Sequence, residues 1–260
     1  MKLENQVALI IGPGTIGEAI ALLFAEEGAK IAIADLPKMK PRLNTVVAGI
    51  KRKNGKAVAL SVDITDEKQV VTMVSTVVKK WGRIDILANC AGYRGPSQPV
   101  NKISESEWNR ILDINLKGPF FCCKAVLDQM LKQKSGSIIS ITGNAGKDGV
   151  ALRGALCAAK WGIVGLTRTI AREAGPSGIR ANVIAPSAVA DGNLRSTFQE
   201  RAKAMGKSVE EVERSVLESS PLHKFAQPEE VAKVALFLVS SDSSHTTGES
   251  INVSGGEIMY

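Results

Sequence analysis

Seven short runs of β-branched and apolar residues recur along the chain, and longer amphipathic stretches separate them. Apolar strands that alternate with helices are typical of a parallel sheet covered on both faces. No linker, repeat or low-complexity tract interrupts this order, so residues 1–260 are expected to form a single doubly wound α/β domain with a seven-stranded parallel sheet. The predicted strands are Val7–Ile11, Lys30–Ala34, Ala57–Val62, Ile84–Ala88, Ser137–Ile141, Ile179–Ile184 and Ser250–Val253.

Several helices carry boundary signals in their first or last turn. A Ser followed three residues later by Glu predicts a capping box, in which the two residues cap the same helix start reciprocally. Proline at the first helical position and glycine after the last one mark the ends in the same way. The helices predicted from these signals are Thr15–Glu27 before Gly28, a helix from the Ser104–Glu107 box toward Leu131, one behind the Ser208–Glu211 box, and Pro228 to about Val239.

Composition excludes several classes of partner. The apolar runs are far shorter than the roughly 20 residues of a membrane helix, and the N-terminus does not resemble a signal peptide, so a cytoplasmic protein is expected. The net charge is +7, but the basic residues are scattered and only 4% of residues are aromatic, which argues against nucleic-acid binding. This charge instead favours an anionic small-molecule substrate.

No metal site is predicted. The chain has four cysteines without C-x-x-C spacing and only two histidines, so no zinc ligand set can be assembled. The thiols are expected to be buried and reduced. Cys157, which lies near the candidate reaction site, is the one position where a nucleophilic role is an alternative.

The turn Gly12–Gly17 follows an apolar strand and opens a helix, with the spacing G-x-G-x-x-G. Gly12 permits the tight turn, Gly14 lets the backbone approach a pyrophosphate, and Gly17 allows close helix–strand packing. The free N–H groups of the helix start, at Thr15 and Ile16, suit the phosphates. These features predict a dinucleotide site in a Rossmann-type fold.

Asp35 stands at the end of the second predicted strand, 18 residues after Gly17. That is close to the roughly 20 residues expected for the carboxylate that binds a ribose 2′-hydroxyl. A carboxylate there would repel a 2′-phosphate, so NAD is favoured over NADP. Lys38, Lys40 and Arg42 follow and leave NADP as the alternative.

The chain as a whole resembles the short-chain dehydrogenase/reductase family. The resemblance is carried by V-A-L-I-I-G-P-G-T-I-G near the start, Asp63–Ile64, N-C-A-G at 89–92, D-I-N-L-K-G around Asn115, and Lys160. It implies an NAD-dependent oxidoreductase of a small carbonyl or alcohol substrate. It also implies these roles: Asp63 and Ile64 at the adenine, Asn89 and Gly92 at the adenosine ribose, Asn115 in the proton relay, Lys160 at the nicotinamide ribose, and Pro186 and Val189 near the carboxamide.

Two positions depart from the family's reaction chemistry. The family's proton-donating tyrosine stands four residues before the lysine, where this chain has Leu156, and its helper serine corresponds to Gly143. Leucine transfers no proton and glycine has no side chain. Since general acid–base assistance contributes roughly 10²- to 10⁴-fold in rate, ordinary tyrosine-driven hydride transfer is not expected. The glycine turn is also one residue shorter than the family's, with Ile11 in place of its threonine.

Several side chains could substitute. Arg153 shares a helix face with positions 156 and 160 and could clamp a carboxylate or polarise a carbonyl. Tyr93, directly after N-C-A-G, is an alternative acid, and Lys160 could relay a proton through water. Thr142 or Asn144 could supply the missing serine's hydrogen bond.

A substrate lid is expected at about residues 191–222. Asp191 is interpreted as a helix N-cap for its segment Leu194–Leu217. The family resemblance further implies a homotetramer or homodimer built from the helix after Ser104 and the helix that carries Lys160. The alternative to a diverged oxidoreductase is a lyase, an isomerase or an inactive dinucleotide-binding descendant.

Overall fold

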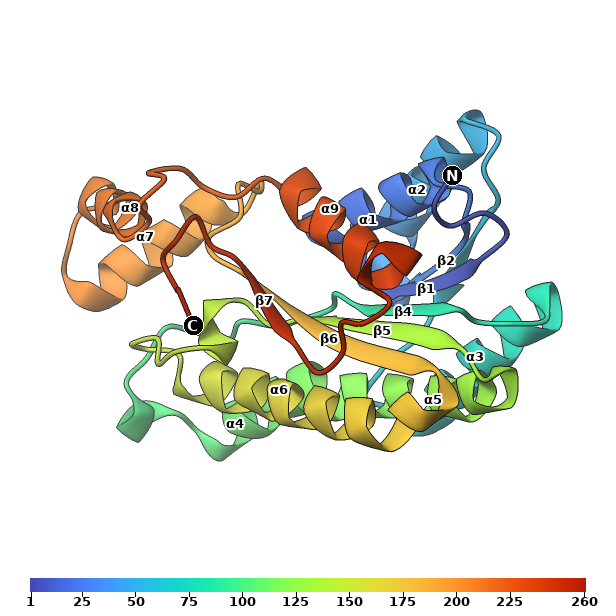
Figure 1. Cartoon of the computed structure of the whole chain (residues 1–260). Helices are drawn as coiled ribbons and strands as arrows, with labels where there is room; N and C mark the ends of the chain where they lie inside the picture. Colours follow the sequence, from blue (N-terminus) through green and yellow to red (C-terminus); the bar gives the residue numbers. More distant parts are fainter.

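The computed structural model covers residues 1–260 and is built around one fully parallel seven-stranded sheet (Figure 1). The strand order is β3-β2-β1-β4-β5-β6-β7, which confirms the predicted fold class. The observed strand ends differ from the predicted ones by at most two residues: β4 begins at Ile86 instead of Ile84, and β6 continues to Pro186. The strands are β1 (Val7–Ile11), β2 (Lys30–Asp35), β3 (Ala57–Ser61), β4 (Ile86–Asn89), β5 (Gly136–Ile141), β6 (Ile179–Pro186) and β7 (Ser250–Val253).

Helices cover both faces of the sheet. In Figure 1, α1, α2 and α9 lie on one side, α3, α5 and α6 lie on the other, and α7 and α8 project beyond the end of the sheet. The helices are α1 (Thr15–Glu26), α2 (Lys40–Arg52), α3 (Glu67–Trp81), α4 (Glu105–Leu112), α5 (Gly118–Gln133), α6 (Gly154–Ala174), α7 (Leu194–Met205), α8 (Val209–Glu218) and α9 (Pro228–Val239).

The alternation of side chains along each strand divides the core into two layers. In β1, Ala8 and Ile10 pack into the cluster that contains the apolar faces of α1, α2 and α9. Leu9 and Ile11 pack into the second cluster, with α3, α5 and α6. Because successive side chains of a strand point to opposite faces, a strand buried on both faces must be apolar throughout, as β1 is.

The two predicted capping boxes differ. At α8 both halves form: Glu211 N donates to Ser208 Oγ (3.1 Å) and Ser208 N donates to Glu211 Oε2 (2.8 Å). At α4 only Glu107 N donates to Ser104 Oγ (3.2 Å), and the buried Glu107 Oε1 has no hydrogen-bond partner. The box predicted there is therefore half formed, because the Glu107 side chain turns inward instead of back to the helix start.

The predicted long helix from Ser104 toward Leu131 is interrupted. A turn of π-helix, Asp113–Lys117, separates α4 from α5 and places Asn115 in the interior. A π-turn inserts one extra residue into the helix and is frequent at functional sites. The hydrophobic spacing of the sequence did not reveal it.

No helix of the protein combines the length and the apolar character that a membrane span requires.

Candidate active site

The candidate site lies at the carboxyl ends of the strands, next to the point where the strand order reverses between β1 and β4. In open α/β sheets this is where ligands bind. A cavity of about 390 Å³ opens there, between the glycine turn, the loops after β4, β5 and β6, the start of α6, and α7. Eight of the predicted cofactor-binding residues line it: Gly14, Thr15, Ile16, Gly17, Gly92, Lys160, Pro186 and Val189. So do all six predicted catalytic residues: Tyr93, Asn115, Thr142, Asn144, Arg153 and Lys160.

The glycine turn packs too closely for side chains at two positions. Gly12 has φ +93°, and a Cβ there would lie 2.6 Å from the backbone nitrogen of Ala91. A Cβ on Gly17 would lie 1.9 Å from the carbonyl oxygen of Gly12. Gly14 is the N-cap of α1 and offers no side-chain cap, so the first N–H groups of the helix are left for a ligand.

The acidic residue at the end of β2 is partly buried. Asp35 Oδ1 accepts a hydrogen bond from the backbone nitrogen of Leu36 (2.6 Å), and burial raises the pKa of its carboxyl group. Arg42 reaches the wall of the cavity beside the turn and pairs with Glu18 of α1 at 3.3 Å. A carboxylate and a guanidinium therefore both lie at this end of the site.

Five predicted cofactor-binding residues lie outside the cavity lining: Gly12, Asp35 and three others predicted at the adenosine. Asp63 Oδ1 accepts hydrogen bonds from the backbone and hydroxyl of Thr65 (2.9 and 2.7 Å). Ile64 is buried in the α3–α5 layer of the core. Asn89 is 4% exposed and donates to Ser140 Oγ (3.3 Å), so its side chain lies between β4 and β5.

Asn115 and Lys160 meet beside Gly92. Asn115 Nδ2 donates to the carbonyl oxygens of Tyr93 (2.7 Å) and Ile111 (2.9 Å), and Tyr93 N donates to its Oδ1 (3.2 Å). A Cβ on Gly92 would lie 3.0 Å from Asn115 Oδ1 and 3.7 Å from Lys160 Nζ. The π-turn and the loop after β4 thus fix Asn115 near Gly92, where Lys160 Nζ also lies.

The Lys160 amine is buried and has one hydrogen-bond partner. Its Nζ donates to the carbonyl oxygen of Ile141 (2.8 Å). Burial lowers the pKa of Lys160 to about 8, and the nearby Cys90 opposes this shift. Burial raises the pKa of the Cys90 thiol to about 12, so this cysteine is no proton carrier near neutrality.

Both anomalous positions face the cavity. Leu156 packs against the small apolar cluster of Ile111, Ala155 and Ala159. Gly143 has φ +76°, in the left-handed region that favours glycine. A Cβ would have room there, since its nearest neighbour would be the Pro186 carbonyl oxygen at 3.5 Å, but the backbone of any other residue would be strained.

The other candidate substitutes already have partners. The ring of Tyr93 lies under the Arg110 guanidinium (4.2 Å), and burial and the adjacent Glu107 raise the pKa of its phenol. Thr142 Oγ1 donates to the Ile184 carbonyl (3.4 Å). Asn144 Nδ2 donates to Glu257 Oε1 (3.1 Å). The thiol of Cys157, the alternative nucleophile, accepts a hydrogen bond from Val150 N (3.3 Å).

The segment after β6 departs from its prediction in one detail. Asn193, not Asp191, is the N-cap of α7; Asp191 Oδ1 instead accepts from the backbone nitrogen of Asn193 (3.0 Å) and closes the turn before the helix. Val189 pairs with Ala226 in an isolated parallel bridge, which ties this segment to the chain before α9.

Arg153 precedes α6 and is only 10% exposed. It donates to the carbonyl oxygens of Gly95 and Arg94 and lies 3.8 Å from Glu200 of α7. Three residues that sequence reasoning missed line the cavity near it: Arg94, Ser97 and Arg201. Arg94 directly follows Tyr93, which was a usable signal, whereas Arg201 is one basic residue among several on α7.

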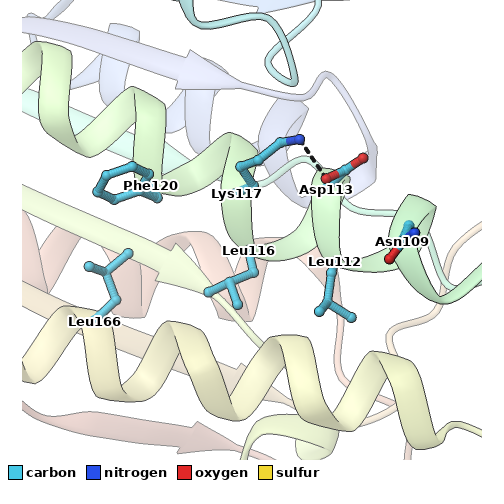
Figure 2. Close-up of a pocket in the computed structure, with 7 residues that line it drawn as sticks. All are labelled: Asn109, Leu112, Asp113, Leu116, Lys117, Phe120 and Leu166. Atoms are coloured by element: carbon cyan, nitrogen blue, oxygen red, sulfur yellow. Dashed lines mark ion pairs between the residues drawn. The ribbon is translucent and has the colours of Figure 1, made fainter.

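A second depression lies on the outside of the molecule, between α4–α5 and α6. In Figure 2, Leu112 and Leu116 point toward α6 and Leu166 points back from it, while the Asp113–Lys117 ion pair (2.6 Å) faces away. Phe120, 41% exposed, closes one end. Its lining is mainly apolar and contains no candidate catalytic group. No group of three or more His, Cys, Asp or Glu side chains is arranged to hold a metal ion.

Comparison with known proteins matches residues 12–257 to the family model described as enoyl-(acyl carrier protein) reductase. The chain is 36% identical over 260 residues to a 3-oxoacyl-(acyl-carrier-protein) reductase of Thermotoga maritima, with complete coverage of both chains. It is also 36% identical over 261 residues to a galactitol 2-dehydrogenase of Agrobacterium fabrum, again with complete coverage.

Solved structures agree with these relatives. NAD⁺-bound xylitol dehydrogenase superposes with a TM-score of 0.95 at 33% identity, covering 98% of this chain and 100% of that one. A variant of actinorhodin polyketide ketoreductase with NADPH gives a TM-score of 0.92 at 27% identity, covering 98% of each chain. The chain therefore belongs to the short-chain dehydrogenase/reductase family of oxidoreductases.

Proposed function

We propose that this protein exchanges hydride between NAD(H) and a small carbonyl or alcohol substrate, with Lys160 in place of a tyrosine as the ionisable group at the reacting oxygen. The observation that carries the proposal is that Asn115 and Lys160 line the same cavity as Leu156, each fixed by a hydrogen bond to a backbone carbonyl. A protein that only binds a dinucleotide needs the lysine but has little use for the asparagine.

The residues around the turn fit a dinucleotide. Gly12 and Gly17 are packed so closely that only glycine is accommodated, and the start of α1 offers uncapped N–H groups to a pyrophosphate. Asp35 at the end of β2 favours a ribose 2′-hydroxyl over a 2′-phosphate, so NAD is the proposed cofactor. Asp63, Ile64, Asn89, Gly92, Pro186 and Val189 keep the roles that the family resemblance implies.

Lys160 is the proposed proton donor because the alternatives in the cavity are poorly placed. Tyr93 is turned toward Glu107 and Arg110, and Thr142 toward a backbone carbonyl. A nicotinamide bound beside Lys160 would supply the hydride to the carbonyl carbon in reduction and accept it in oxidation. In reduction, the Lys160 ammonium then delivers a proton through water to the new alkoxide, and in oxidation the neutral amine accepts it.

The test is the pH dependence of turnover on a panel of small carbonyls and alcohols. Because Lys160 is protonated below its pKa of about 8, kcat/KM for reduction should fall as the pH rises through about 8, and kcat/KM for oxidation should rise. Lys160→Met should abolish the inflection and lower kcat by about 10²-fold or more. Tyr93→Phe is the matched control and should keep both the inflection near pH 8 and the wild-type kcat.

Other outcomes decide against the proposal. An inflection that disappears in Tyr93→Phe but survives in Lys160→Met would assign proton transfer to the tyrosine. Turnover of no member of the panel, with NADH binding intact, would favour the alternative of a lyase, an isomerase or an inactive dinucleotide-binding protein.

The apolar depression in Figure 2 supports a homo-oligomer as the working form. Leu112, Leu116, Phe120 and Leu166 would be covered by a second copy of the same helices. Light scattering should report a dimer or tetramer, and Phe120→Glu should shift it toward the monomer. A monomeric wild-type protein at micromolar concentration would contradict this.

A further inference from the structure

Three arginines converge where the loop after β4, the start of α6 and α7 meet. Arg94 and Arg153 come from the loop and from the residue before α6, and Arg201 comes from α7. Ser97 lies on the same wall of the cavity. We call this set, Arg94, Ser97, Arg153 and Arg201, the arginine pocket.

Two groups of the arginine pocket have polar atoms without partners. Arg201 makes no ion pair and no hydrogen bond, although its Nε is fully buried. The hydroxyl oxygen of Ser97 is also buried and unpartnered. Buried polar groups are nearly always hydrogen-bonded, so these two unpaired groups leave the cluster with hydrogen-bonding capacity that no protein group uses.

The charge of the arginine pocket is not balanced. Glu200 is the one carboxylate close to Arg153, at 3.8 Å, and it also accepts a hydrogen bond from Ser97 N (2.5 Å). Three guanidinium groups against one carboxylate leave two positive charges in excess. The two carboxylates of the cavity wall, Asp191 and Glu257, are bound to Asn193 N and Asn144 Nδ2 and are not among the charged groups that act on Arg153.

Arg153 is held in place by its own loop. The preceding residue, Leu152, has φ +66°, a strained conformation for a bulky side chain. The carbonyl of Leu152 accepts a hydrogen bond from Gln98 N (3.1 Å), and Arg153 itself donates to the carbonyls of Arg94 and Gly95. The guanidinium is thus fixed before any ligand arrives, which lowers the cost of binding.

We propose that the arginine pocket binds a dianionic end group of the substrate, of the phosphate monoester type. Two excess positive charges match a dianion, and guanidinium groups bind phosphate oxygens in bidentate fashion. The proposal rests on the proposed function only in assigning the anion to the substrate.

The cavity sets the size of that substrate. Arg153 and Lys160 both line this cavity of about 390 Å³. A carbonyl or hydroxyl at Lys160 and a phosphate at Arg153 would therefore belong to one small molecule. The substrate class is a small phosphorylated hydroxy or oxo compound.

Calorimetric titration with inorganic phosphate, and separately with acetate, tests the pocket without requiring turnover. Arg201→Gln should weaken phosphate binding about ten- to a hundredfold, because it removes charge-assisted hydrogen bonds. Arg195→Gln, an exposed arginine on the same helix, is the matched control and should bind like the wild type. Phosphate held at the glycine turn would be equally affected by both variants. Arg201→Lys keeps the charge without the planar fork and should bind with intermediate strength.

The outcomes are separable. Phosphate binding that is equal in Arg201→Gln and Arg195→Gln, or absent from the wild type at about 10 mM, would overturn the pocket. If acetate binds more tightly than phosphate, the pocket is a site for a carboxylate, which contradicts the proposal of a dianionic group. If turnover is found, phosphate should inhibit competitively against the carbonyl substrate and not against NADH. A protein that binds phosphate at Arg201 but lacks turnover would sink the proposed function alone.

Discussion

The two ends of the cavity are built on different principles. At the glycine turn, backbone packs on backbone, and a single methyl group at Gly12 or Gly17 would collide with fixed atoms. At the other end, Leu156 presents an apolar side chain to the cavity and Gly143 has no side chain. The first end has the close glycine packing and the uncapped helix start that suit a pyrophosphate, in a turn one residue shorter than the family's. The second has Lys160 and Asn115 beside these two positions, and the proposed function gives Lys160 the proton transfer.

Restoring a tyrosine at position 156 should have the largest effect. Leu156→Tyr places a phenol in the cavity above Lys160, and turnover should rise about 10²- to 10⁴-fold, the range of general acid–base assistance. The measurement is kcat/KM for the best member of a carbonyl panel. Leu156→Phe supplies the ring without the hydroxyl and should give no gain.

Adding Gly143→Ser to Leu156→Tyr should destabilise the protein. Its φ of +76° would strain a serine, at a cost of about 1–3 kcal/mol. We therefore expect the double variant Leu156→Tyr with Gly143→Ser to melt at a lower temperature than Leu156→Tyr alone. If Leu156→Phe raised the rate as much as Leu156→Tyr, the ring would act by packing. That result would contradict the claim that this end of the cavity lacks a proton donor at position 156.

Alanine substitutions at two glycines of the turn should affect stability differently. A Cβ on Gly17 would meet the Gly12 carbonyl at 1.9 Å, whereas a Cβ on Gly14 would meet nothing within 4 Å. Gly17→Ala should lower the free energy of unfolding by about 1–3 kcal/mol, as overpacking does, and should weaken NADH binding. Gly14→Ala should fold normally and weaken NADH binding only, if a pyrophosphate approaches that backbone. Denaturant unfolding and NADH titration separate the two, and equal stabilities would contradict the packing at Gly17.

A smaller change should alter the choice of cofactor. Asp35→Ser removes the carboxylate that disfavours a 2′-phosphate, so the ratio of NAD to NADP affinities should fall about tenfold, a change of 1.4 kcal/mol. Arg42, at the wall beside the turn, would assist NADP in that variant by exchanging its ion pair with Glu18 for the 2′-phosphate. Asp128→Ser, on the exposed face of α5, is the control. A wild-type preference for NADP would show that Arg42 outweighs Asp35.

The fold could be predicted from the sequence because buried strands have a recognisable residue pattern. A strand covered on both faces must be apolar throughout, so the core strands were found with ends within two residues of those observed. No such pattern indicates the π-turn at Asn115, since one inserted residue hardly alters the apolar pattern of the helix. The inward turn of Glu107 depends on tertiary contacts and was equally hidden.

The candidate site was readable only in part. Spacing relative to strands and glycines located the turn, Lys160 and Asn115, and all six predicted catalytic residues line one cavity. Arg201 was missed because its place in the cavity wall depends on where α7 lies, which no local pattern encodes. Thr142 and Tyr93 were reasonable substitutes in sequence, but their hydroxyl groups point toward Ile184 and Glu107.

NADH fluorescence titration of the wild type and Leu156→Tyr tests the difference between the two ends most directly. The glycine turn, Asp35 and Lys160 are unchanged by the substitution, so both proteins should bind NADH with the same dissociation constant, in the range of about 1–100 μM, while only the variant gains turnover. No binding below about 1 mM by either protein, or binding gained only with the tyrosine, would contradict an intact cofactor site.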